Sequence, residues 1–157
     1  MKVETLIELF IHDLSDIYSA EKQITRALPK MARAATDPDL INAFQLHLEE
    51  TQGHIERLDN VVESHEELRI TRMKCHALEG LAEEAQEIIE SVVAGPVRDA
   101  GLIGAAQKVE HYEIATYGTL IAMAKKLGLN KAATLLAETL EEEKSTDVKL
   151  TEIAEQH

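Results

Sequence analysis

The sequence of residues 102–127 is LIGAAQKVEHYEIATYGTLIAMAKKL. Its apolar residues recur at steps of three and four, which is the pattern of an amphipathic helix. Two acidic residues, Glu110 and Glu113, interrupt the apolar stripe, and their i,i+3 spacing places them side by side. Burying a carboxylate without a partner costs several kcal/mol. The stretch therefore predicts a long helix that carries two glutamates into the protein core, where they need a cation or a proton.

The same periodicity extends over most of the chain, and short segments containing Gly or Pro interrupt it. Asp37 and Pro38 suit the N-cap and the first position of a helix, and Asn130 suits a second N-cap. Gly128 suits the left-handed turn that ends the preceding helix. We expect four long helices, over residues 3–35, 38–64, 96–127 and 130–154, and a shorter one over residues 75–93.

The order of these helices predicts an all-α fold. Short links join the first two long helices and the last two, so each pair is expected to form an antiparallel hairpin. The connection between the hairpins is long enough to run the length of a bundle, and it contains the short helix. A four-helix bundle with one long crossover is the ferritin-like arrangement. We therefore expect residues 1–157 to form a single ferritin-like domain whose crossover carries a short fifth helix.

The composition argues against several classes of protein. The 157 residues include 16 basic and 29 acidic side chains, and the net charge of −13 opposes binding to nucleic acids and anionic membranes. Only 3% of residues are aromatic, which disfavours a β-sheet protein. The single cysteine, Cys75, excludes an internal disulfide, and neither a signal peptide nor a membrane-spanning run is visible. These features predict a soluble, acidic, mostly helical domain and allow a cytosolic setting.

The other long helices also carry acidic or imidazole groups on their apolar faces. Glu21 lies in the middle of the stripe of the first helix. Glu50 and His54 share one face of the second helix, and Glu143 and Asp147 lie one turn apart in the last. The candidate metal ligands are therefore Glu21, Glu50, His54, Glu110, Glu113, Glu143 and Asp147.

The negative charge of this cluster requires compensation, and the neighbouring lysines lie on other faces of the helices. Two metal ions would supply it. Carboxylate oxygens and imidazole nitrogens suit iron, manganese or zinc, and glutamates that bridge two ions are typical of di-iron bundles. Glu21 and His54 are 33 positions apart, as are Glu110 and Glu143, so each pair can meet at the same height of its hairpin. We expect two metal ions, iron first, with manganese or zinc as alternatives.

Some polar residues near the stripes have structural interpretations. His47 lies one turn from Glu50. We interpret it as a histidine at the edge of the core, with contact to a metal ligand as the alternative, and Glu142 as part of a solvated acidic face. Tyr117 is interpreted as a core residue. Arg57 either pairs with an inward carboxylate or lies outside the core.

Glu110-x-x-Glu113 followed by Glu143-x-x-x-Asp147 is similar to the second half of a rubrerythrin-type di-iron site, with Asp147 where that family has His. More closely, the chain resembles the bacterial YciF/YciE stress-protein family over nearly its whole length. The segments that carry this resemblance are residues 18–23 (YSAEKQ), 47–51 (HLEET), 108–113 (KVEHYE) and 140–144 (LEEEK). The resemblance implies a ferritin-like fold, a bacterial cytoplasmic location, a homodimer and a dinuclear metal site.

The second helix departs from the usual ferritin-like motif, which is Glu-x-x-His. Here Glu50 and His54 are four residues apart, which leaves open which of them is the main ligand of that helix.

The expected function is that of a dinuclear, di-iron carboxylate protein of the bacterial stress response, with redox chemistry on oxygen or peroxide. The chain lacks a four-cysteine module like that of rubredoxin, so the electron donor would be external. The alternative is a non-enzymatic helical stress protein or dimeric binding module in which the metal is structural or absent. A hydrolase that uses two metal ions is less favoured, because no nucleophile or phosphate-binding loop is evident. The sequence leaves open whether the protein is an enzyme and which residues would be catalytic.

Overall fold

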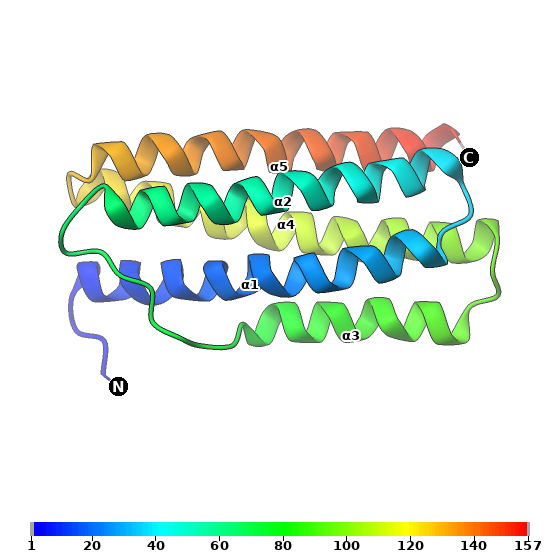
Figure 1. The fold of residues 1–157 in the computed structure, drawn as a ribbon, viewed down its shortest axis with the longest axis horizontal. Helices are drawn as coiled ribbons and strands as arrows, with labels where there is room; N and C mark the ends of the chain where they lie inside the picture. The colour runs from blue at the N-terminus through cyan, green and yellow to red at the C-terminus, as the bar shows by residue number, and fades with distance from the viewer. Residues whose placement is uncertain (1, 157) are drawn as a thin grey trace.

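The computed structural model describes residues 2–156, and within that range it contains five helices and no strand (Figure 1). The all-α class is therefore confirmed. In chain order the helices are α1 (Leu6–Ala34), α2 (Pro38–Glu63), α3 (His76–Ser91), α4 (Pro96–Lys126) and α5 (Asn130–Gln156). No helix in this part of the chain has the apolar length that a membrane span requires.

The caps explain where the helices begin and end. Thr5 and Glu8 form a capping box, so α1 begins three residues later than the periodicity indicated. Asp37 caps α2 as expected, since its carboxylate accepts the N–H of Asp39 at 2.9 Å. Asn130 was expected to be the N-cap of α5, and this is wrong. The first helical hydrogen bond joins the Ala133 N–H to the carbonyl of residue 129, so Asn130 already lies inside the first turn.

The turn between α4 and α5 has the expected glycine. Gly128 adopts a positive φ of 74° and donates its N–H to the carbonyl of Lys125, while Leu129 N–H donates to the carbonyl of Ala124. These two bonds form a Schellman motif, which satisfies carbonyls at the end of a helix. The tight turn makes α4 and α5 an antiparallel hairpin.

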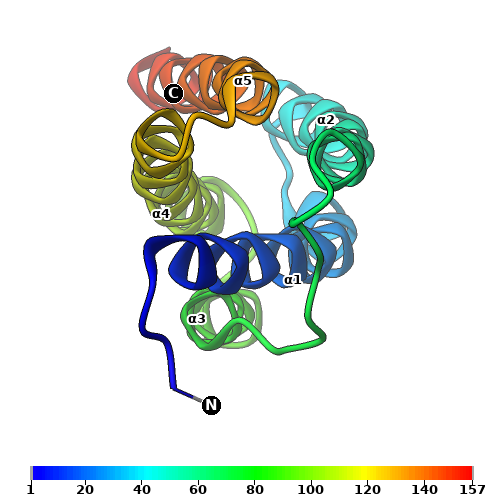
Figure 2. The same cartoon turned by 90° about the vertical axis from the view of Figure 1, so that its left-hand side faces the viewer.

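The four long helices form a closed ring. Contacts join α1 to α2, α2 to α5, α5 to α4 and α4 to α1, and the view along the bundle shows this order (Figure 2). The short helix α3 lies outside the ring, against α1 and α4. Hydrogen bonds tie the preceding connection to α1. Thr71 N–H donates to Ser15 Oγ, and Cys75 N–H donates to Ser19 Oγ and Gln23 Oε1. This is the four-helix bundle with a long crossover and a short fifth helix that the sequence predicts.

One end of the bundle is held by the buried carboxylate of Asp99, in the first turn of α4. It accepts the backbone N–H of Thr36 at 2.8 Å, the Thr36 hydroxyl at 2.7 Å and the N–H of Asp37 at 3.0 Å. These three bonds fasten the turn between α1 and α2 to the start of α4. They therefore connect the two hairpins at a point remote from the middle of the bundle.

Replacing Asp99 with Ala is expected to lower the free energy of unfolding by about 2–3 kcal/mol, because three part-buried donors lose their carboxylate acceptor. Urea unfolding measures this change. Glu84→Ala, at an exposed position of α3, is the control and should change the free energy by less than about 0.5 kcal/mol. Equal effects of the two substitutions would show that the Asp99 contacts do not hold the hairpins together.

Candidate metal centre

Six polar side chains meet in the middle of the ring, and each is at most 5% exposed. The four long helices all contribute to them. They form two groups in which the possible ligand atoms lie within 4.8 Å of one another. The first group is Glu21, His54, Glu113 and Glu143, and the second is His47, Glu110 and Glu143.

Glu143 belongs to both groups and lies between them. On one side, His54 Nδ1 is 2.9 Å from Glu143 Oε1 and 3.0 Å from Glu21 Oε2. In the second group, His47 Nε2 is 2.6 Å from Glu110 Oε1. A carboxylate shared by two neighbouring ligand sets has the position of a bridge between two ions.

Several oxygens of the cluster lack a hydrogen-bond donor within the described part of the chain. Both oxygens of Glu113 and both of Glu143 are in this state, as are one oxygen of Glu110 and one of Glu21. Buried polar atoms are normally hydrogen-bonded, so a concentration of exceptions at one place calls for a specific explanation. Protons or cations shared among the carboxylates would satisfy these oxygens.

The pKa values of these groups follow from burial and mutual contact. Burial raises the pKa of Glu21, Glu110 and Glu113, and the charge of Glu143 raises it further in all three. Burial would lower the pKa of His54, but Glu143 and Glu21 beside it raise the value to about 10. Burial would also raise the pKa of Glu143, but its neighbours Glu113, Glu110 and His54 lower it. In the absence of metal, the surroundings therefore favour the protonated forms of Glu21, Glu110, Glu113 and His54 and the ionised form of Glu143.

Five of the seven predicted ligands lie in the two groups: Glu21, His54, Glu110, Glu113 and Glu143. The other two, Glu50 and Asp147, lie outside them and are partly exposed. Glu50 Oε2 accepts the hydroxyl of Thr146 at 3.2 Å. Asp147 Oδ2 lies 3.1 Å from His111 Nε2. Metal binding by any of the seven stays a prediction.

The structure adds two residues that were interpreted otherwise. His47 is a member of the second group rather than only a histidine at the edge of the core. Glu142 was expected on a solvated face; its side chain is 40% exposed, and its Oε1 also lies 2.9 Å from His54 Nε2. The signal for His47 is present in the sequence, because His47, Glu50 and His54 share one helix face at steps of three and four.

The chain matches one family along almost its whole length. The model of the family described as Domain of unknown function (DUF892) matches residues 5–157. The chain belongs to the DUF892 family. Protein YciF of Escherichia coli (strain K12) is 64% identical over 154 residues, which cover 98% of this chain and 93% of YciF. The resemblance to the YciF family is thereby confirmed.

Solved structures show how this DUF892 fold compares with known ones. The crystal structure of the E. coli stress protein YciF has a TM-score of 0.95 at 64% identity and covers 97% of this chain and 96% of that one. YcfI from Rhodopseudomonas palustris has a TM-score of 0.91 at 45% identity, and the match covers 96% of this chain and 95% of YcfI. A protein from Xanthomonas campestris shares the fold, with a TM-score of 0.77 at 24% identity. That match covers 97% of this chain and 93% of the Xanthomonas protein.

In this DUF892 protein, Arg57 supports the centre from outside. Its guanidinium donates to both oxygens of Glu142, at 3.0 and 3.3 Å, and to Thr139 Oγ1 at 2.9 Å. Glu142 in turn contacts Nε2 of His54.

Tyr117 is fully buried beside the cluster. Burial raises the pKa of its phenol, and the charges of Glu21 and other cluster carboxylates raise it further, so the phenol stays protonated.

Proposed function

We propose that this protein is a dinuclear metal-carboxylate protein of the stress response, and that it uses two metal ions in redox chemistry with oxygen or peroxide. Iron is the first candidate, with manganese and zinc as alternatives. The observation that carries the proposal is the position of Glu143 in two buried groups of ligand atoms. A buried carboxylate shared in this way is the recurrent bridging device of di-iron bundles.

The charges of the cluster favour two divalent ions. Four buried glutamates carry four negative charges when ionised, and two divalent cations with neutral imidazoles neutralise them. With both imidazoles protonated and no metal, two negative charges would remain in the core. The mixture of carboxylate oxygens and imidazole nitrogens is suited to iron, manganese or zinc.

His54 is oriented for metal binding through one of its two nitrogens. Glu142 lies 2.9 Å from Nε2 and can accept its proton, and Arg57 fixes Glu142 through two hydrogen bonds. Nδ1 then faces Glu21 and Glu143 with its lone pair directed at the centre. A carboxylate behind a metal-binding histidine fixes the ring orientation and raises its basicity.

Two bound iron ions would supply electrons in pairs for the reduction of oxygen or peroxide. The chain itself contributes exclusion of bulk water, since the six residues of the two groups are at most 5% exposed. The phenol of Tyr117 is buried near Glu21, Glu113 and Glu143 and stays protonated, so it can donate a hydrogen bond there. Protons held by Glu110 and Glu113 leave when metal binds, which couples metal loading to pH.

A second candidate is a non-enzymatic stress protein or dimeric binding module whose metal is structural or absent. The raised pKa values of Glu21, Glu110 and Glu113 favour it, because protons alone can then hold the carboxylates together. In that case the buried cluster would be a store of protonated acids rather than a reaction centre.

One experiment separates the two candidates. The protein is loaded with iron(II) without oxygen, the bound metal is counted, and oxygen or peroxide is then added. We expect about two ions per chain, as the two ligand groups require, and an oxygen-dependent change in absorbance. No bound metal and no change in absorbance would contradict the first candidate and support the second, in which protons alone hold the carboxylates together.

A further inference from the structure

A narrow groove lies between α2 and α5, on the side of the centre where His47 is found. Its volume is about 80 Å³. Its lining residues are Ala43, Leu46, His47, Glu50, Ser145, Thr146 and Lys149. Leu46 and Ser145 are exposed, and His47 is buried. The groove therefore extends from the protein surface to one of the two ligand groups.

Possible ligand atoms follow one another along this groove. The Glu50 side chain is 31% exposed, and its Oε2 lies 3.9 Å from His47 Nδ1. Nδ1 is buried and has no hydrogen-bond partner within residues 2–156. The other nitrogen of the same ring, Nε2, lies 2.6 Å from Glu110 in the centre. A single imidazole thus connects a surface carboxylate with a buried one.

The other sides of the centre are less suited to a hydrated cation. On the His54 side, the ion pair between Glu142 and Arg57 covers the ring. Towards α3, the cavity beside His47 and Glu110 measures only about 20 Å³, and its other lining residues are apolar. Larger cavities of about 320 and 450 Å³ lie elsewhere, and no residue of the two ligand groups lines them.

We propose that the groove between α2 and α5 is the route by which a divalent cation reaches the buried centre, and that Glu50 is the first carboxylate it meets. This inference rests on the proposed function. Thr146 holds Glu50 towards the groove through its 3.2 Å hydrogen bond. Lys149 lines the same groove and opposes the approach of a cation. Charges placed along a cleft change association rates by about ten- to a thousandfold, so both residues act on the loading rate.

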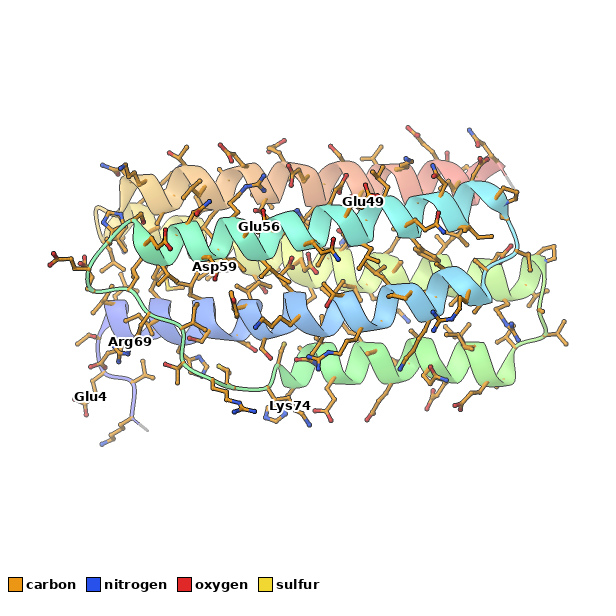
Figure 3. All side chains as sticks on the ribbon, viewed as in Figure 1. Glu4, Glu49, Glu56, Asp59, Arg69 and Lys74 are labelled. Carbon is orange, nitrogen blue, oxygen red and sulfur yellow. The ribbon has the colours of Figure 1, made fainter. Side chains whose placement is uncertain are left out.

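The test follows cobalt(II) binding to the metal-free protein by stopped-flow absorbance. Glu50→Gln is expected to slow loading by about tenfold, while the final number of bound ions stays unchanged. Glu49→Gln is the matched control, because it removes the same charge from the neighbouring residue, which lies on the exposed surface of α2 (Figure 3). Its loading rate should stay within about twofold of the wild-type rate.

Lys149→Gln gives a second measurement with the opposite sign, since removing a positive charge from the groove should accelerate loading several-fold. If the wild-type protein binds two cobalt ions and both groove variants load at its rate, the route is wrong and the proposed function stands. If Glu50→Gln lowers the number of bound ions instead of the rate, Glu50 is a permanent ligand and the inference also fails. If the wild-type protein binds no cobalt, the proposed function fails as well.

Discussion

Replacing Glu143 with Gln is expected to abolish tight binding of both metal ions. Glu143 is the residue that belongs to both ligand groups, so its loss removes a charged ligand from each. We expect the affinity for each ion to fall by more than about 100-fold, since even outer partners of metal ligands contribute 10–100-fold. Elemental analysis after gel filtration gives the number of ions per chain.

Two further variants show whether the loss of metal is specific to the shared residue. Glu113 belongs to the first group only, so Glu113→Gln should lose one ion and keep the other. Glu141→Gln is the matched control on α5, because its side chain is 77% exposed, and it should retain both ions. Retention of one tightly bound ion by Glu143→Gln would show that the two ions do not share Glu143 as a ligand.

The metal-free protein is expected to lose stability steadily as the pH rises from about 5 to about 9. The pKa of Glu21, Glu110 and Glu113 is raised above 4.5 in the folded state, and that of His54 is raised from 6.5 to about 10. Such groups bind more protons folded than unfolded. Their contribution is complete below the unfolded pKa and is lost as the pH rises through the folded one. Glu143 has a lowered pKa, so its contribution is lost only under acidic conditions.

Bound metal should reverse this trend, because metal replaces the protons that the rising pH removes. At a free metal concentration of about 1,000 times the dissociation constant, each site adds about 4 kcal/mol. Thermal unfolding at pH 5.5, 7 and 8.5, with and without manganese(II), measures both effects. Glu113→Gln should flatten the pH dependence of the metal-free protein, since one of the raised groups is gone. A metal-free protein that grows more stable over this pH range would contradict the proton-held cluster.

The fold was predictable because the periodicity of the apolar residues is strong and the interruptions are sharp. Asp37 with Pro38, and Gly128, set helix ends in the structure as they do in the sequence. The error at Asn130 was one of position within a turn. Asparagine is favoured as an N-cap, but the Schellman motif after α4 starts the next helix one residue earlier.

The site was predictable where an acidic residue interrupts an otherwise apolar stripe, as Glu110 and Glu113 do. Periodicity gives only the direction in which a side chain leaves the helix. Asp147 lies four residues after Glu143, so it is rotated by about 40° around the helix, and its short side chain contacts His111 of α4. Glu50 is turned aside in a similar way by Thr146 of α5. Which neighbour lies at such a position depends on how the helices pack.

The histidines of α2 also show that the role of a residue depends on how the helices pack. His47 and His54 are seven residues apart, so two turns of α2 place both rings towards the centre. A histidine on an apolar face is usually an ordinary core residue, so the helical spacing of His47 does not by itself distinguish a ligand from a core residue. Its role depends on the 2.6 Å contact with Glu110, a residue of another hairpin.

The division of the ligands between the two hairpins has a consequence for the order of folding. The hairpin of α1 and α2 supplies Glu21, His47 and His54, and the hairpin of α4 and α5 supplies the remaining ligands. Neither hairpin alone contains a complete group, and Glu21 and Glu143 are 122 positions apart in the chain. On the proposed function, a newly made chain has no complete ligand group until both hairpins have docked. Metal would bind only after the two hairpins have packed together. Its binding would therefore slow the unfolding of the bundle and leave the folding rate unchanged.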